Sequence, residues 1–208
     1  IYLAKSQIIL KSTETNFETP FTNPYSSFEE TANQLRVIKS SNLIEEVVKK
    51  MNLNVSYYII GRIKTSEVFE NVPIEVTSEN YGTNAYYREF FFDFIDNDKY
   101  QLSFKGNNGE IVKKEYQFDN LILDHGFHFK ITKKTALPIN QSLSSSSQAT
   151  YKFVIKQNSD LIYKYKRSMT VENEEWTSIL NISVQDEIAN RAVMFLDTLS
   201  VVYIEYLL

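Results

Sequence analysis

Imidazole and carboxylate groups are the first place to look for chemistry, and this chain offers few arrangements of them. Its two histidines lie in the run His125-Gly126-Phe127-His128, and it contains no cysteine. Zinc is held by three or four His, Cys or acidic ligands, so this pair lacks partners, and we expect both to be surface residues of a strand. Asp93, Asp96 and Asp98 alternate as in part of a calcium loop, but the glycine and distal glutamate of that loop are missing. We interpret them as a solvated turn and predict no metal site.

Aromatic side chains are the second candidate, because exposed rings can stack on sugars. The chain has 14 Tyr, 14 Phe and 1 Trp, and four of these residues fall in segments that we interpret as loops: Tyr81, Tyr86, Tyr87 and Trp176. They are possible glycan contacts. The alternative is that tyrosine is simply common in strands and interfaces.

Other kinds of site lack their residues. The five glycines, at 61, 82, 106, 109 and 126, form neither a dinucleotide fingerprint nor a phosphate-binding P-loop. We therefore predict no nucleotide, no other cofactor and no catalytic residue in this segment. The net charge of −4 argues against nucleic acid as a partner. A carboxylate pair for glycan cleavage would meet only in space, so a glycan-cleaving enzyme stays open as the last of our hypotheses.

The elements that would position these residues follow from hydrophobic periodicity. Apolar residues at steps of three and four predict helices over Phe28 to Met51 and from Glu187 to Tyr206, with Asp186 capping the second. Between Pro73 and Val171 the period is two, which is typical of strands, and Gly106-Asn107-Asn108-Gly109 predicts a hairpin. We also predict a turn at Gln157 to Asp160 followed by a strand from Leu161 to Val171.

These elements predict an α+β fold in which a small mixed sheet, built from both chain ends, is covered by helices. The expected strands of that sheet are Leu3 to Leu10, Val55 to Ile60 and Ile179 to Val184. An all-β meander or sandwich module is inserted into it. The expected domains are residues 1–72 with 172–208, and 73–171.

The chain begins without methionine and ends in an apolar run, so we interpret it as a piece of a longer protein. No stretch approaches the ~20 apolar residues that cross a bilayer, and the start does not have the layout of a signal peptide.

Several stretches of the two ends resemble a known family. The segments that carry the resemblance are Asn33 to Ser40, Val47 to Tyr58, Gly61 to Phe69, Ile182 to Asp186, Ala189 to Ala192, and Tyr203 to Glu205. They are similar to Wzz-type chain-length determinants, in the version found in bacterial tyrosine kinases of capsule and exopolysaccharide export. The inserted β module is outside the resemblance.

The resemblance implies the periplasmic portion of an inner-membrane polysaccharide co-polymerase. Its partners would be further copies of the full-length protein and the polysaccharide polymerase and export machinery. Any tyrosine kinase domain would belong to the cytoplasmic part of the parent protein, outside this segment. Our first functional hypothesis is therefore a non-catalytic scaffold that regulates polysaccharide chain length and export. The alternative is a carbohydrate-binding β module of an export or cell-surface protein.

Overall fold

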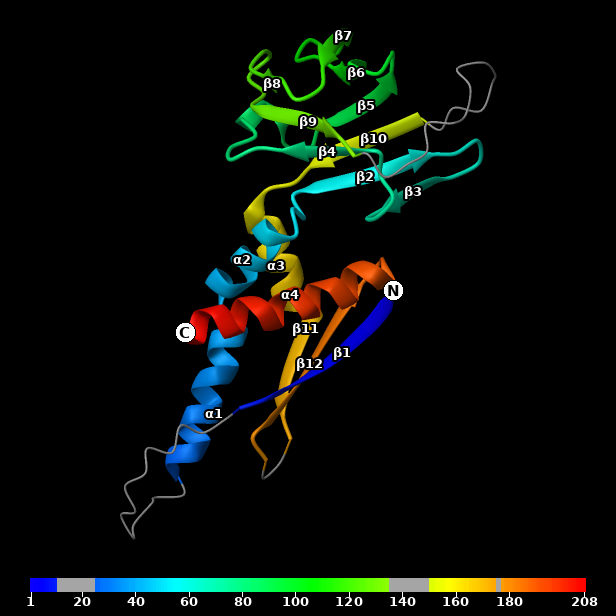
Figure 1. Cartoon of the computed structure of the whole chain (residues 1–208). Coiled ribbons are helices and arrows are strands. Elements are labelled where there is room, and N and C mark those ends of the chain that lie inside the picture. Colours follow the sequence, from blue (N-terminus) through cyan, green and yellow to red (C-terminus); the bar gives the residue numbers. More distant parts are fainter. Residues whose placement is uncertain (11–24, 135–149, 175–176) are drawn as a thin grey trace. The chain divides into compact units, whose positions relative to one another are not determined.

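The structure, a computed structural model, describes residues 1–10, 25–134, 150–174 and 177–208. It divides into two compact units (Figure 1). Unit 1 comprises Ile1–Met51 and Asn158–Leu208, and unit 2 comprises Asn52–Gln157. Unit 2 is therefore inserted, in sequence, between the two segments that build unit 1.

The sheet of unit 1 joins strands from the two ends of the chain. Its order is β1 (Tyr2–Ile9), β12 (Ile179–Asp186) and β11 (Met169–Asn173), and both pairs are antiparallel. Tyr2 lies opposite Asp186 and Ile9 opposite Ile179. Alternate residues Leu180, Ile182 and Val184 are buried, as the period of a strand requires.

In its described ranges, unit 1 contains four helices: α1 (Tyr25–Ile38), α2 (Ser41–Lys50), α3 (Asn158–Ser168) and α4 (Ala189–Leu207). Helix α2 begins after Ser40, whose hydroxyl accepts a hydrogen bond from the backbone N–H of Leu43 at 3.2 Å. Helix α4 packs against β1, β12 and α2, and α3 packs against α2. The buried face of α4 carries Phe195, Leu199 and Val202.

The described part of unit 2 forms two antiparallel sheets. The six-stranded sheet has the order β3 (Thr65–Val68), β2 (Val55–Ile60), β10 (Thr150–Ile155), β5 (Glu89–Phe94), β6 (Lys99–Lys105) and β7 (Ile111–Gln117). The three-stranded sheet has the order β4 (Ile74–Thr77), β9 (Phe129–Lys133) and β8 (Leu121–Ile122). The predicted hairpin is confirmed, since Lys105 of β6 lies opposite Ile111 of β7.

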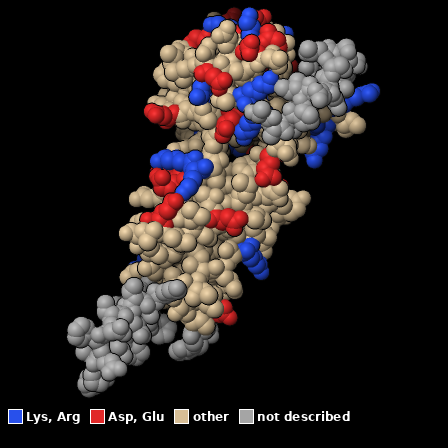
Figure 2. Space-filling view, in the orientation of Figure 1, with Lys and Arg blue, Asp and Glu red and all other residues tan. Residues whose placement is uncertain are grey.

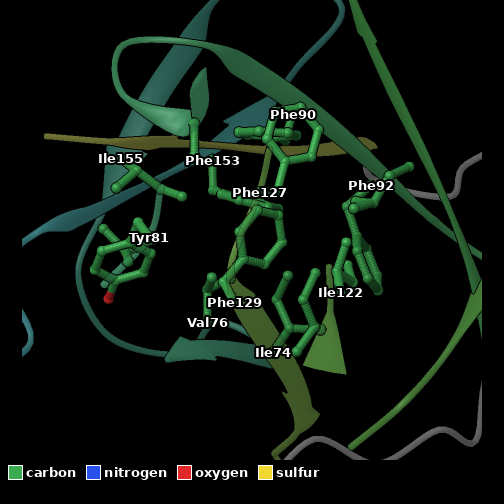
Figure 3. Packing of buried hydrophobic residues seen from close by; sticks show 14 of the residues in the cluster. Ile74, Val76, Tyr81, Phe90, Phe92, Ile122, Phe127, Phe129, Phe153 and Ile155 are labelled. Carbon is green, nitrogen blue, oxygen red and sulfur yellow. The ribbon is translucent and has the colours of Figure 1, made fainter. Parts of the chain in front are cut away.

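Aromatic rings fill the space between the two sheets (Figure 3). Phe90 is the centre of this core: it is fully buried, and its ring centroid lies 4.9 Å from that of Phe153 and 5.1 Å from that of Phe127. Ring pairs at these separations add to the stabilisation from buried area. The richness in phenylalanine is thus explained by packing inside unit 2.

The fold class that we expected is wrong. More of the described residues lie in strands than in helices, and the largest of the three sheets has six strands, so the chain is not a small mixed sheet covered by helices. All pairs between named strands are antiparallel. The cause lies in Val55–Ile60: this strand pairs with Thr150–Ile155 in unit 2, and β11 takes its expected place in unit 1.

The expected strand from Leu161 to Val171 is also corrected. Residues Asn158–Ser168 form α3, and the strand β11 begins only at Met169. Leu161 and Tyr165, four residues apart, are the buried pair of this helix. Asp160 in its first turn and the basic Lys166 and Arg167 in its last turn suit the helix dipole.

The domain boundaries that we expected, after residue 72 and before residue 172, differ from those of the compact units. The chain passes from unit 1 to unit 2 after Met51 and returns at Asn158. Strands β2 and β3 therefore belong to the inserted unit, and α3 belongs to unit 1. No helix within the described ranges has the length and apolar character needed to span a membrane.

Candidate functional site

The structure brings three of the four predicted glycan-contact residues together. The ring centroids of Tyr81 and Tyr86 lie 6.5 Å apart, as do those of Tyr86 and Tyr87. Tyr81 is buried, with 6% of its surface exposed, and its hydroxyl donates to Asn52 Oδ1 at 3.1 Å. Tyr87 is 52% exposed. Only Tyr87 of the three offers a largely open ring, and Trp176 lies outside the described residues.

Burial, followed by the nearby Tyr86, raises the pKa of Tyr81 to about 12. Because the folded chain holds this proton more tightly than the unfolded chain, Tyr81 stabilises the fold below pH ~10, and the contribution is lost as the pH rises toward 12. The wild type should lose unfolding free energy between pH 8 and pH 11. We expect the Tyr81→Phe variant to lose about 1 kcal/mol less. Urea unfolding at the two pH values measures it, with Tyr87→Phe as the exposed control. An equal loss of unfolding free energy in the wild-type and Tyr81→Phe chains would contradict the raised pKa of Tyr81.

In the described residues, neither the two histidines nor the acidic cluster belongs to a group that could bind a metal ion. His125 and His128 are both exposed, and both lie in the loop that precedes β9. Asp96 Oδ1 accepts from the backbone N–H groups of Asp98 and Lys99, at 2.8 and 2.7 Å, which closes a turn. No group of three or more His, Asp or Glu residues in the described ranges could hold a metal ion.

A buried ionic network that the sequence did not reveal lies where β12 meets α4. The guanidinium of Arg191 donates from Nε to both carboxylate oxygens of Asp186, at 2.9 and 3.0 Å, and its Nη2 lies 2.6 Å from Oδ1. The Tyr165 hydroxyl donates to Asp186 Oδ2 at 2.9 Å. The side chain of Asp186 is fully buried, and that of Arg191 is 7% exposed. Such a bidentate pair fixes both partners in one orientation.

The capping role that we predicted for Asp186 is wrong, because the N-cap of α4 is Ile188 and no side chain makes a capping hydrogen bond there. Asp186 Oδ1 instead accepts from the backbone N–H of Ile188 at 2.9 Å, in the turn just before α4 begins. Glu187 extends the network toward the surface, with its Oε2 2.6 Å from Lys164 Nζ and 3.2 Å from Arg191 Nη2. The five charged and phenolic groups therefore join α3, β12 and α4.

Electrostatics keep the Asp186 carboxylate ionised. Burial alone would raise its pKa, but hydrogen bonds from Arg191 and the Ile188 N–H, with the charges of Arg191 and Lys164, outweigh burial and hold the pKa below its ordinary value. The pKa of Tyr165 is raised, mainly by burial and next by the Asp186 charge. An enclosed carboxylate with these partners has the character of a structural anchor rather than of a catalytic base.

The solvent-facing side of α4 is the strongest candidate for a functional surface in unit 1. Its exposed apolar residues are Val193 (51%), Met194 (39%), Val201 (47%) and Ile204 (56%). They lie on one side of the helix, because at 3.6 residues per turn positions 193, 194, 201 and 204 fall within an arc of about 100°. Figure 2 shows largely uncharged surface along this helix, interrupted by an acidic patch; the acid at this spacing is Asp197. We call this stripe the α4 apolar face.

A groove borders the α4 apolar face. It has a volume of about 770 Å³ and is lined by parts of α2 and α4, including Leu43, Val202 and Tyr206. Lys50 Nζ donates to both oxygens of Glu205, at 2.7 and 2.9 Å, and so ties the two helices together. Singly exposed apolar residues are ordinary on a protein surface, whereas here several lie together on the α4 apolar face beside the groove.

Comparison with known proteins supplies no assignment. The chain matches no protein-family model, and no curated protein matches it.

Proposed function

We propose that this chain is a non-catalytic, periplasmic scaffold segment of an inner-membrane polysaccharide co-polymerase that regulates polysaccharide chain length and export. The stretches that carry the family resemblance support this proposal by their positions. Residues 33–40 and 47–51 lie along α1 and α2, and residues 182–186 and 189–192 form the end of β12 and the start of α4. All of these lie in unit 1, although residues 52–58 and 61–69 of the same resemblance lie in unit 2.

The α4 apolar face is the observation that carries the proposal. Exposed contiguous apolar surface of this kind marks protein or membrane contacts, and a scaffold acts through contacts between copies and with partner proteins. Val193, Val201 and Ile204 point away from the core that the opposite side of the same helix forms with β1 and β12. We assign the α4 apolar face to self-association of the full-length protein.

Photocrosslinking in the native membrane tests this assignment. The segment contains no cysteine, so Val201→Cys, in a parent protein whose remaining cysteines are removed, can carry a single benzophenone label. We expect this label to crosslink copies of the protein to one another. Thr170→Cys, exposed on β11, is the matched control. Crosslinking from position 170 but not from position 201 would contradict the assignment.

A charged substitution tests the function itself. Val201→Asp with Ile204→Asp places two carboxylates on the α4 apolar face, so we expect weaker association and a shift in the length distribution of the exported polysaccharide. Electrophoresis of the polysaccharide measures the shift. Since both side chains are about half exposed, the melting temperature of the 208-residue chain should stay near that of the wild type. An unchanged length distribution in a folded, membrane-inserted double variant would reject the scaffold role of this surface.

A further inference from the structure

Three loops of unit 2 meet around a polar cleft that no part of the proposed scaffold role uses. The loops comprise residues 82–88, 106–110 and 124–126, and the cleft has a volume of about 350 Å³. Small-molecule pockets span ~300–1000 Å³, so this cleft is of the size for a small ligand. Its lining includes Asn84, Arg88, Asn107, Asn108, Glu110 and His125.

Arg88 holds the walls of the cleft in place. Its Nε donates to the backbone oxygen of Asn84 at 3.0 Å, its Nη2 donates to Asn107 Oδ1 at 2.9 Å, and its Nη1 donates to the backbone oxygen of Lys105. The guanidinium also lies over the Phe127 ring, 5.5 Å from its centroid. Its donors are thus directed at protein oxygens, so Arg88 is a positioning residue rather than an anion fork.

The same loops adopt backbone conformations that ordinary residues avoid. In the described ranges, Tyr87 and His125 are the two residues other than Gly, Asn and Asp with positive φ, at 61° and 53°. A Cβ at Gly82 would lie 2.2 Å from the Gly126 backbone oxygen, and one at Gly126 would lie 2.7 Å from Asn84 Nδ2. Strain of this kind concentrates at ligand sites, where the surrounding structure over-determines the backbone.

The side chains that line the cleft select the chemistry of a ligand. Asn108, Glu110 and His125 are exposed. Together they offer an amide that donates and accepts, a carboxylate that accepts, and an imidazole with one donor and one acceptor when neutral. A ligand with several hydroxyl groups, each of which donates and accepts, matches this set. An anion would meet the Glu110 carboxylate, and an apolar ligand would find mainly polar groups and the partly buried Val112.

We propose that this cleft binds a neutral saccharide unit through Asn108, Glu110 and His125. This inference goes beyond the scaffold role and does not rest on it, because the ligand class follows from the cleft alone. It also differs from the sequence-based expectation, which placed glycan contacts at Tyr81, Tyr86, Tyr87 and Trp176.

Nuclear magnetic resonance titration of the 208-residue chain tests the inference. The probes are glucose, galactose, mannose and N-acetylglucosamine, each raised to tens of millimolar, with glucuronate and inorganic phosphate as anionic probes. We expect at least one neutral sugar to give saturable shifts of the backbone amides of residues 84, 106–110 and 125. Glu110→Gln and His125→Ala should each weaken this binding about tenfold, the effect expected for losing a hydrogen bond to a charged or well-placed polar group.

Glu115→Gln is the matched control, because Glu115 is an exposed glutamate of β7 outside the cleft. It should leave the affinity unchanged. Saturation by phosphate or glucuronate alone would overturn the ligand class, and shifts confined to Tyr87 and its neighbours would overturn the site. The absence of saturable shifts in the cleft with all four neutral sugars would overturn the inference as a whole. None of these outcomes bears on crosslinking through α4, so the two proposals fail separately.

Discussion

Replacing Arg191 by leucine is expected to lower the free energy of unfolding by about 3–5 kcal/mol. The substitution leaves the carboxylate of Asp186, which is fully buried, without the guanidinium that donates to both of its oxygens. An uncompensated buried charge costs far more than a lost surface pair. Urea unfolding followed by circular dichroism measures the change, and Arg167→Leu, an exposed arginine of α3, is the control that should change stability by less than about 0.5 kcal/mol.

The pH dependence of Arg191→Leu provides an independent check. In the wild type the pKa of Asp186 lies below its ordinary value, so its stabilising effect is present at neutral pH and is lost as the pH falls through the folded-state pKa, below about 4. In the variant, burial dominates and raises that pKa, so the folded state accepts a proton readily. We therefore expect Arg191→Leu to lower the free energy of unfolding by less at about pH 5 than at about pH 7. An equal destabilisation at both pH values would mean that the buried charge of Asp186 does not cause it.

Replacing Phe90 by alanine should lower the free energy of unfolding of unit 2 by about 3–5 kcal/mol. Phe90 is fully buried, and four rings surround it: those of Phe104, Phe127, Phe129 and Phe153. Removing the ring leaves a cavity that both sheets line, and paired strands cannot collapse into it without breaking their register. Hydrogen exchange of backbone amides in β5, β6 and β10 reports the loss directly.

Ile111→Ala is the control for Phe90→Ala, since Ile111 lies on β7 with 74% of its surface exposed. It should change the free energy of opening, as hydrogen exchange measures it in the same strands, by less than about 0.5 kcal/mol. If Phe90→Ala lowered protection by less than about 1.5 kcal/mol, the core would be more plastic than its packing implies.

Periodicity predicted local structure well and strand partners only in part. The period of two correctly indicated β5, β6 and β7, and the two glycines with their asparagines fixed the hairpin between β6 and β7. The segments Leu3 to Leu10 and Ile179 to Val184 were expected in one sheet, and the structure pairs β1 with β12. Val55–Ile60 was assigned to the wrong sheet because an apolar run indicates a buried strand without naming its neighbour. The helix α3 was missed because Leu161, Tyr163 and Tyr165 alternate, and this alternation concealed the four-residue spacing of its buried pair.

Sites were harder to predict than elements. The sequence indicated loop tyrosines, but it could not show that Tyr81 is buried against Asn52 while Tyr87 is exposed. It indicated Asp186 as a helix cap, which is wrong. The partners of Asp186, Arg191 and Tyr165, are recognisable only once α3 and α4 lie beside β12. The cleft is a meeting of three loops that are separated along the chain by strands, and nothing in the sequence indicated that these loops meet.

The insertion of unit 2 between the two segments of unit 1 imposes an order on folding during synthesis. Unit 2 is complete once Gln157 has left the ribosome, but β1 must wait for β12, and Gln7 meets Asn181 only 174 residues later. At ~5–20 residues per second, this delay is roughly 10–35 s. Until then the backbone N–H and C=O groups of β1 have no strand to pair with. Strand β1 is therefore an open sheet edge until residues 179–186 follow it.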